Sequence, residues 1–163
     1  MRKVYCDIRK CLACRSCEIA CAVRHSVSGE LYLALREAER PPRRLVKTMA
    51  TTLGPFPLRC HHCEDAACID ACKTGATYRD PISGKVLINR EKCVGCWMCV
   101  MVCPFGAVFP DAETGIALKC DLCDGHDTPA CVAACPTRAL FYQEFDEFKK
   151  AYEKSDPRRI REK

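Results

Sequence analysis

The run Cys93-Val94-Gly95-Cys96-Trp97-Met98-Cys99-Val100-Met101-Val102-Cys103-Pro104 decides the fold of this chain. Its spacing is C-x2-C-x2-C-x3-C, followed by proline. Three thiolates two residues apart wrap three corners of a cubane iron–sulfur cluster within one tight loop. The fourth cysteine lies where a helix has begun and the chain points away, so it is free to bind a different cluster. The run therefore predicts one half of a module that holds two [4Fe–4S] clusters.

Related cysteine groups occur at three other places in the chain. Together the four groups contain sixteen of the 17 cysteines, and only Cys6 stands outside them. The groups are Cys11, Cys14, Cys17 and Cys21; Cys60, Cys63, Cys68 and Cys72; Cys93, Cys96, Cys99 and Cys103; and Cys120, Cys123, Cys131 and Cys135. The first and third have the same spacing, whereas the second and fourth have longer gaps before their third cysteine. This internal repeat predicts four [4Fe–4S] clusters.

The composition indicates that metal supplies much of the folding energy. The chain has 163 residues and is 48% hydrophobic when cysteine is counted. Without cysteine the apolar share is roughly 37%, which is thin for a core built from side chains alone. Structural zinc also uses C-x2-C pairs, but a tetrahedral zinc site has no use for a third cysteine two residues further on. A disulfide scaffold is disfavoured because an odd cysteine count leaves one thiol unpaired.

Charge and hydropathy indicate the cellular compartment and the kind of partner to expect. The opening Met1–Asp7 carries basic residues with no apolar stretch behind them, so no signal peptide is predicted. No apolar run approaches the roughly 18 residues of a membrane span. These features predict a cytoplasmic protein, where cysteines are more often metal ligands than disulfides. The formal charge is +5, but four clusters with their thiolates shift it to roughly −3, so nucleic acid is not a predicted partner.

Local patterns predict an α+β fold of short helices and small hairpins. Hairpins are expected at 76–88, with a turn at 80–84, and at 107–118, with a turn at 111–115. Short helices are expected to carry the third and fourth cysteines of each group, at 16–24, 65–71, 95–102 and 129–134. A further amphipathic helix is expected at 145–154, with Phe148 and Tyr152 on one face, packed on the outer module.

The crossing fourth cysteines imply that the groups work in pairs. The second and third groups are neighbours in sequence and predict one compact module at 55–117. The first and fourth groups, at opposite ends of the chain, must then form the other module from 1–54 and 118–163. The predicted architecture is thus two tandem bacterial-ferredoxin-like modules, one inserted within the other.

The stretch from Cys6 to Tyr142 resembles the four-cluster ferredoxin-like electron-transfer subunits of carbon monoxide dehydrogenase, hydrogenase, formate dehydrogenase and dimethyl-sulfoxide-reductase-type complexes. Its opening, from Val4 to Ser26, is most similar to CooF-type subunits, which take electrons from carbon monoxide dehydrogenase. The resemblance implies a non-catalytic subunit that relays single electrons between a catalytic oxidoreductase subunit and a second redox protein. Carbon monoxide dehydrogenase is the favoured source, with formate dehydrogenase, hydrogenase or a tungsten or molybdenum oxidoreductase as alternatives.

The same resemblance implies four ligand sets. They are site 1 (Cys11, Cys14, Cys17 and Cys135), site 2 (Cys21, Cys120, Cys123 and Cys131), site 3 (Cys72, Cys93, Cys96 and Cys99) and site 4 (Cys60, Cys63, Cys68 and Cys103). In that order the clusters are expected to form a line with site 4 at the far end. Ala22 and Lys73 stand where the third and fourth groups have proline, which removes no ligand.

Residues outside the sixteen ligands have less specific interpretations. We interpret Cys6 as a small hydrophobic residue that is buried. His61 and His62 are interpreted as positioning or packing residues. Trp97 shields a cluster from water or, alternatively, docks a partner. Two basic clusters are either solvated or dock a partner: Arg36, Arg40, Arg43, Arg44 and Lys47, and Arg158, Arg159, Arg161 and Lys163. No nucleotide-binding glycine motif and no nickel or molybdenum ligand set is readable, so no catalytic centre is predicted.

Overall fold

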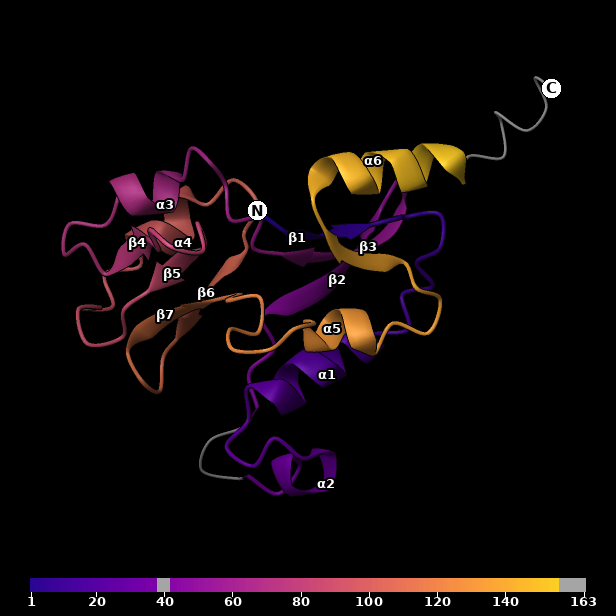
Figure 1. The fold of residues 1–163 in the computed structure, drawn as a ribbon. Helices are drawn as coiled ribbons and strands as arrows, with labels where there is room; N and C mark the ends of the chain where they lie inside the picture. Colours follow the sequence, from indigo (N-terminus) through magenta and orange to yellow (C-terminus); the bar gives the residue numbers. More distant parts are fainter. Residues whose placement is uncertain (38–41, 156–163) are drawn as a thin grey trace.

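The structure is a computed structural model that describes residues 1–37 and 42–155, and Figure 1 shows them arranged in two lobes. The left lobe contains α3 (Ala67–Asp70), β4 (Thr77–Arg79), β5 (Val86–Ile88), α4 (Met98–Val102), β6 (Val108–Asp111) and β7 (Ile116–Lys119). The right lobe contains β1 (Lys3–Cys6), α1 (Ser16–Arg24), α2 (Leu31–Ala34), β2 (Val46–Thr51), β3 (Gly54–Arg59), α5 (Ala130–Ala133), β8 (Leu140–Gln143) and α6 (Phe145–Lys154).

Both predicted hairpins are confirmed. Strand β4 pairs antiparallel with β5, from Thr77 opposite Ile88 to Arg79 opposite Val86. Strand β6 pairs with β7 in the same way, and the turn between them closes through a hydrogen bond from the Gly115 amide to the Asp111 carbonyl at 2.8 Å. These strands lie close in sequence and are separated by turn residues, so local chemistry suffices to specify them.

Two further strand pairs were not predicted. Hairpin β2–β3 runs from Val46 opposite Arg59 to Thr51 opposite Gly54, and the prolines in β3 hide its strand character because proline cannot donate a ladder hydrogen bond. Strand β1 pairs with β8 and thereby joins the two ends of the described chain. The predicted module boundaries fall within β3 and β7, so each boundary lies in a hairpin; the division itself stays a prediction.

The helices follow the predicted positions with one systematic difference. Helices α1 and α6 have the predicted bounds, whereas α3, α4 and α5 are shorter. Each of these three contains only the third cysteine of its group, and the fourth lies beyond the helix end, so the expectation that they carry both is wrong. For Cys103 the reason is Pro104, because a residue before proline is disfavoured in the helical conformation; Cys103 has φ −70° and ψ 112°.

Cysteines form a large part of both hydrophobic cores. In the right lobe Cys21, Cys120 and Cys131 pack with the buried residues Val4, Leu45, Val46, Leu122 and Leu140. In the left lobe Cys99 packs with Val108 and Ala117, and the half-buried Trp97 covers them. A core in which ligand-type side chains replace aliphatic ones depends on what those thiols bind.

Helix α6 covers the β1–β8 sheet, as its amphipathic pattern predicted (Figure 1). Phe148 stacks on Tyr5 with ring centroids 5.0 Å apart, and it also meets Phe141 and Tyr152. Asp7, only 1% exposed, accepts two hydrogen bonds from the Arg9 guanidinium, and that guanidinium lies over the Tyr152 ring. Helix α6 thus packs against strand β1 and holds the start of the chain in place. Within the described ranges no helix is long and apolar enough to cross a membrane.

The third cysteine loop is packed against the β6–β7 turn without room for a side chain. Gly95 has φ +66°, and a Cβ there would lie 2.1 Å from the Gly115 carbonyl oxygen. Gly75 has the same φ, with nothing within 4 Å of the equivalent point. We expect Gly75→Ala to cost about 1 kcal/mol, from the left-handed backbone alone, and Gly95→Ala about 1–3 kcal/mol more, from the clash. Thermal unfolding of the two iron-loaded variants measures the difference, and equal midpoints would contradict it.

Candidate metal centres

All four cysteine loops share one backbone turn. The second residue after the first cysteine is left-handed in every loop: Ala13 (φ 54°), His62 (φ 47°), Gly95 (φ 66°) and Leu122 (φ 62°). Only one of these is glycine, and a non-glycine residue in this region costs roughly 1–2 kcal/mol. The turn points the His62 amide at Cys60 Sγ and the Leu122 amide at Cys120 Sγ, both at 3.4 Å. Backbone strain of this kind concentrates at functional sites.

The fourth cysteine of every group accepts a backbone hydrogen bond. The donors are the amides of Leu45 to Cys21 (3.2 Å), Thr77 to Cys72 (3.3 Å), Ala107 to Cys103 (3.4 Å) and Ala139 to Cys135 (3.2 Å). Amide donors stabilise negative charge on a thiolate and tune the potential of a cluster that it binds. Tertiary packing determines the Leu45 donor, which lies 24 residues beyond Cys21.

Site 1 is assembled from the two ends of the chain. Its four cysteines line one cavity in the right lobe, together with Cys6. The cavity forms because strand β1 pairs with β8, while α1, which carries Cys17, packs against α5. Cys14 is solvent-exposed, and its Sγ lies 3.4 Å from the Ser16 hydroxyl. Site 1 therefore reaches the molecular surface.

Site 2 is the most enclosed of the four, since all of its cysteines are buried. Burial raises the pKa of the Cys120 thiol, and it raises the pKa of Cys131 to about 12. These thiols are neutral at ordinary pH unless a positive group stabilises their thiolates. Their chemistry fits metal binding, in which the proton is released as the metal–sulfur bond forms.

Site 4 surrounds a cavity of about 460 Å³ between the lobes. Its four cysteines line the cavity with Lys3, His61 and Phe105, and the His61 ring lies 4.4 Å from the Phe105 ring. Helices α3 and α4, which pack against each other, bring Cys68 and Cys103 to the same space. Glu64 and Asp65 also lie in the lining, and the four thiols are the ligand type that clusters of iron and sulfide take.

Site 3 lies in the left lobe and differs from site 2 in its electrostatics. Burial raises the pKa of the Cys99 thiol, and the neighbouring Cys93, Cys72 and Cys96 raise it further. At Cys72 burial also raises the pKa, but hydrogen bonds from Thr77 and Thr74 outweigh burial and lower the pKa to about 7. Cys96 is solvent-exposed. Three thiols of site 3 thus act on the fourth, Cys99, and one of them, Cys96, reaches the surface.

The structure reverses the predicted order of sites 3 and 4. Cys60 packs against the right-lobe core that holds Cys21 and Cys120, and Lys3 of β1 lines the site 4 cavity. Site 4 therefore adjoins the right lobe, and site 3 is at the far end. The reason is that Cys60 follows directly on β3, at the point where the chain leaves the right lobe.

His25 has a contact that its sequence position did not reveal. Its Nε2 lies 3.2 Å from Asp121 Oδ1, and its Nδ1 lies 2.8 Å from the Cys21 carbonyl oxygen. Burial opposes a charge on the ring, but the hydrogen bonds with Asp121 and Cys21 outweigh burial and raise the pKa of His25 to about 11. A charged His25 thus links the end of α1 to the fourth cysteine loop beside site 2.

His62 is buried, with 1% exposure, and its Nδ1 accepts a hydrogen bond from the Val86 amide at 3.1 Å. Burial and the nearby Lys119 lower the pKa of His62 to about 3, so the ring is neutral and its proton is on Nε2. His62 thus joins the second cysteine loop to β5. This contact supports the predicted positioning role.

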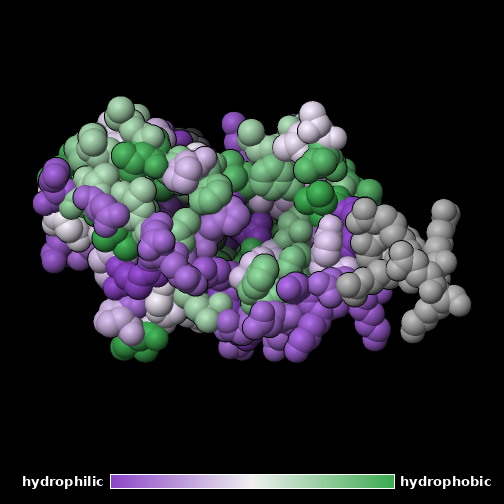
Figure 2. Space-filling view, turned by 90° about the horizontal axis from the view of Figure 1, so that it is seen from above, coloured by the Kyte–Doolittle hydropathy of each residue, from purple (hydrophilic) through white to green (hydrophobic). Residues whose placement is uncertain are grey.

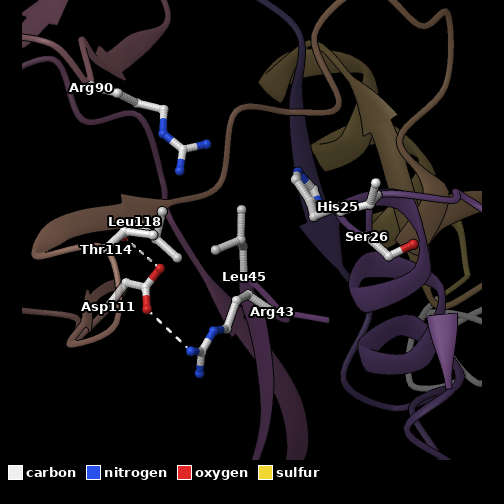
Figure 3. A pocket seen from close by; sticks show the side chains of 9 residues that line it. His25, Ser26, Arg43, Leu45, Arg90, Asp111, Thr114 and Leu118 are labelled. Carbon is white, nitrogen blue, oxygen red and sulfur yellow. Dashed lines mark hydrogen bonds and ion pairs between the residues drawn. The ribbon is translucent and has the colours of Figure 1, made fainter. Parts of the chain in front are cut away.

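Two arginines of the first basic cluster, Arg43 and Arg44, form ion pairs within the protein. Arg43 pairs with Asp111 at 3.1 Å and with Glu113 at 2.7 Å, while Arg44 pairs with Glu18 at 3.1 Å. Figure 3 shows Arg43 reaching Asp111 across a cavity of about 260 Å³ that His25 and Arg90 also line. These two arginines are therefore already paired with acidic side chains of the protein itself. Arg40 and the C-terminal basic cluster lie outside the described residues.

No group of three or more His, Cys, Asp or Glu side chains in the described part of the chain is arranged to hold a single metal ion. A single zinc ion needs every thiolate sulfur about 2.3 Å from one point. A cubane cluster has an iron at each of four corners, and each cysteine binds a different corner.

The fold and the four cysteine sites define a ferredoxin-like iron–sulfur protein. The family described as "4Fe-4S dicluster domain" matches residues 51–145. An "Iron-sulfur protein" of Rhodospirillum rubrum is 39% identical, covering 96% of this chain and 90% of that protein. The "Putative electron transport protein YsaA" of Escherichia coli is 41% identical, covering 85% of this chain and 87% of that protein. The "Thiosulfate reductase electron transfer subunit PhsB" of Salmonella typhi is 36% identical, covering 86% and 74% respectively.

The chain therefore belongs to the 4Fe-4S dicluster family of iron–sulfur proteins. It binds multiple [4Fe–4S] clusters, in agreement with its 17 cysteines. The matched region covers the second, third and fourth cysteine groups, and the similarity to the Rhodospirillum rubrum protein, over 96% of this chain, covers the first group as well.

Cys6, the one cysteine outside the four groups, lines the same cavity as the cysteines of site 1. Cys6 is in β1, and burial raises the pKa of its thiol to about 12. We expect Cys6→Ala to retain all bound iron, because Cys6 only packs against the cavity, and Cys11→Ala to lose about four irons per chain. Iron analysis of anaerobically purified variants measures both, and a loss of iron in Cys6→Ala would show that Cys6 is a ligand.

Proposed function

We propose that this chain is a non-catalytic electron-transfer subunit that carries four [4Fe–4S] clusters at sites 1 to 4. The observation that carries the proposal is that the cysteines of site 1 line one cavity and those of site 4 line another, while helices α1 with α5 and α3 with α4 bring cysteines of different groups together. Each bound cluster supplies one-electron oxidation and reduction. The relatives named as electron transport or electron transfer proteins support the same role.

The chain's own residues would hold the four clusters and set their reduction potentials. First and fourth cysteines accept hydrogen bonds from backbone N–H groups, as at Cys120 and Cys135. These hydrogen bonds favour negative charge on the sulfur atoms and so raise the reduction potential of a bound cluster. Leu122, with 2% exposure, excludes water from site 2. Half-buried Trp97 packs on the core beside Cys93 and Cys99, which supports a shielding role at site 3.

The electron path that we propose runs from site 1 through sites 2 and 4 to site 3. The exposed Cys14 and Cys96 belong to the first and last of these sites. Exposed apolar side chains flank both: Leu12 is 70% exposed beside Cys14, and Val94 and Met101 are 70% and 76% exposed near Cys96. Figure 2 shows hydrophobic side chains gathered on both lobes in the view from above. Because electron transfer weakens steeply with distance, a partner must dock at each end.

The two lobes correspond to the tandem modules that we propose, with residues 55–117 inserted between 1–54 and 118–163. The antiparallel β1–β8 pair supports the outer module, since it joins the two ends of the described chain. The two chain crossings between the lobes support an insertion rather than two consecutive domains (Figure 1).

For the catalytic partner we propose carbon monoxide dehydrogenase, supported by the resemblance of the stretch from Val4 to Ser26. A formate dehydrogenase, a hydrogenase or a molybdenum or tungsten oxidoreductase is the alternative, and the relative named as a thiosulfate reductase electron transfer subunit supports a catalytic oxidoreductase partner. Anaerobic affinity purification from the native cells, with identification of the co-purifying catalytic subunit, distinguishes them. A cytoplasmic location stays a prediction.

The number of clusters is tested on anaerobically purified protein. We expect a brown sample with broad absorption near roughly 400 nm that bleaches on reduction, and about sixteen irons per chain. A colourless sample with about one zinc per four cysteines would instead identify a structural zinc protein. A folded protein with neither metal would exclude both.

Matched cysteine variants test the ligand pairing. Cys135→Ala and Cys14→Ala should remove the same electron paramagnetic resonance signal from the reduced protein, because both residues belong to site 1. Cys103→Ala, which also removes a fourth cysteine, should remove the site 4 signal instead, in common with Cys63→Ala. Each variant should lose about four irons per chain. The pairing is wrong if the signal lost in Cys135→Ala matches that lost in Cys93→Ala.

A further inference from the structure

Two long cationic side chains are buried where the chain passes between the lobes. Arg59 is 5% exposed and ends strand β3, and Lys119 is 6% exposed and ends strand β7. Each directly precedes the first cysteine of a group, Cys60 or Cys120. After β3 the chain enters the left lobe, and after β7 it returns to the right lobe (Figure 1).

In the described part of the chain the partners of these two cations are backbone carbonyl groups and not carboxylates. The Arg59 guanidinium donates to the carbonyl oxygens of Val4 and, at 2.9 Å, Pro57. The Lys119 ammonium donates to the carbonyl oxygen of Val86, with that of Cys120 at 3.4 Å. Within residues 1–37 and 42–155 neither cation forms an ion pair with Asp or Glu. Carbonyl dipoles satisfy their N–H groups but do not neutralise a full charge, and a buried charge needs a counter-charge.

The negative groups that could supply it are cysteine thiolates of sites 2 and 4. Arg59 donates to the carbonyl of Val4, which packs in the right-lobe core with Cys21, Cys120 and Cys131 of site 2. Lys119 donates to the carbonyl of Val86, which lines the site 4 cavity together with the four cysteines of that site. Each cation therefore faces one of the two sites that meet at the junction of the lobes.

We infer that Arg59 and Lys119 are charge-compensating residues for the two middle clusters, Arg59 at site 2 and Lys119 at site 4. This inference rests on the proposed function. A [4Fe–4S] core with four thiolates carries a net charge of about −2, and reduction adds one more negative charge. A fixed cation in a buried, weakly screened environment favours the reduced form, so it raises the reduction potential of the cluster that it faces. In return the cluster supplies the counter-charge that the buried cation lacks.

Variants that separate charge from shape test this inference. Arg59→Gln and Lys119→Gln remove the charge and retain an N–H donor for the carbonyl partners, whereas Arg59→Lys and Lys119→Arg retain the charge. Lys150→Met removes one charge from the exposed face of α6 and is the control for net charge. The measurement is a dye-mediated potentiometric titration of the iron-loaded protein, followed by electron paramagnetic resonance, with the iron content determined on the same samples.

We expect each glutamine variant to shift one component of the titration to lower potential, a different component for each variant. The charge-retaining variants and Lys150→Met should titrate like the parent. Glutamine variants with full iron content and unchanged curves would overturn the inference. If the glutamine variants fail to load iron, parent-like loading in Arg59→Lys and Lys119→Arg supports a need for charge, and failure there as well shows that shape matters and overturns it. A parent protein without clusters would reject the proposed function instead.

Discussion

The structure depends on the bond between cysteine sulfur and iron. The chain has few aliphatic side chains for its length, and both cores are built partly from cysteines. In site 2 Cys120 and Cys131 are buried so deeply that the pKa values of their thiols rise, and a thiolate there needs a positive partner. Iron supplies that partner, so folding and cluster binding are one process. The left-handed residues in all four loops fit this picture, because their strain must be offset by what the loops bind.

The same constraint explains why the protein is divided into two lobes. Helix pairs α1 with α5 and α3 with α4 each bring cysteines of two groups together. Because the groups of one lobe are the first and the fourth, the chain must cross between the lobes twice, and both crossings place a buried cation beside the sites. A positive charge is tolerated in these positions only if the neighbouring sites are negative, as they are when four thiolates surround each cluster. Fold, charge and redox chemistry are thus coupled at one place, the junction of the lobes.

Much of the local structure could be predicted because it depends on neighbours in sequence. Helices α1 and α6 and the hairpins β4–β5 and β6–β7 have the predicted positions. The β2–β3 hairpin was missed because Pro55 and Pro57 weaken a strand pattern, and β1–β8 because its partners are more than 130 residues apart. Arg59, Lys119 and His25 were missed as well. A buried cation and a solvated one look the same in a sequence.

The sequence by itself determined the chemistry: sixteen thiols at spacings suited to cubane clusters, since loop length limits which sulfur atoms can meet one metal core. It also predicts which groups work together, through the crossing fourth cysteines. Only the tertiary structure decided the spatial order of the sites, because that order depends on where each strand delivers its loop and not on spacing. Cys60 follows a strand of the right lobe, so its site adjoins that lobe, and site 3 lies at the far end.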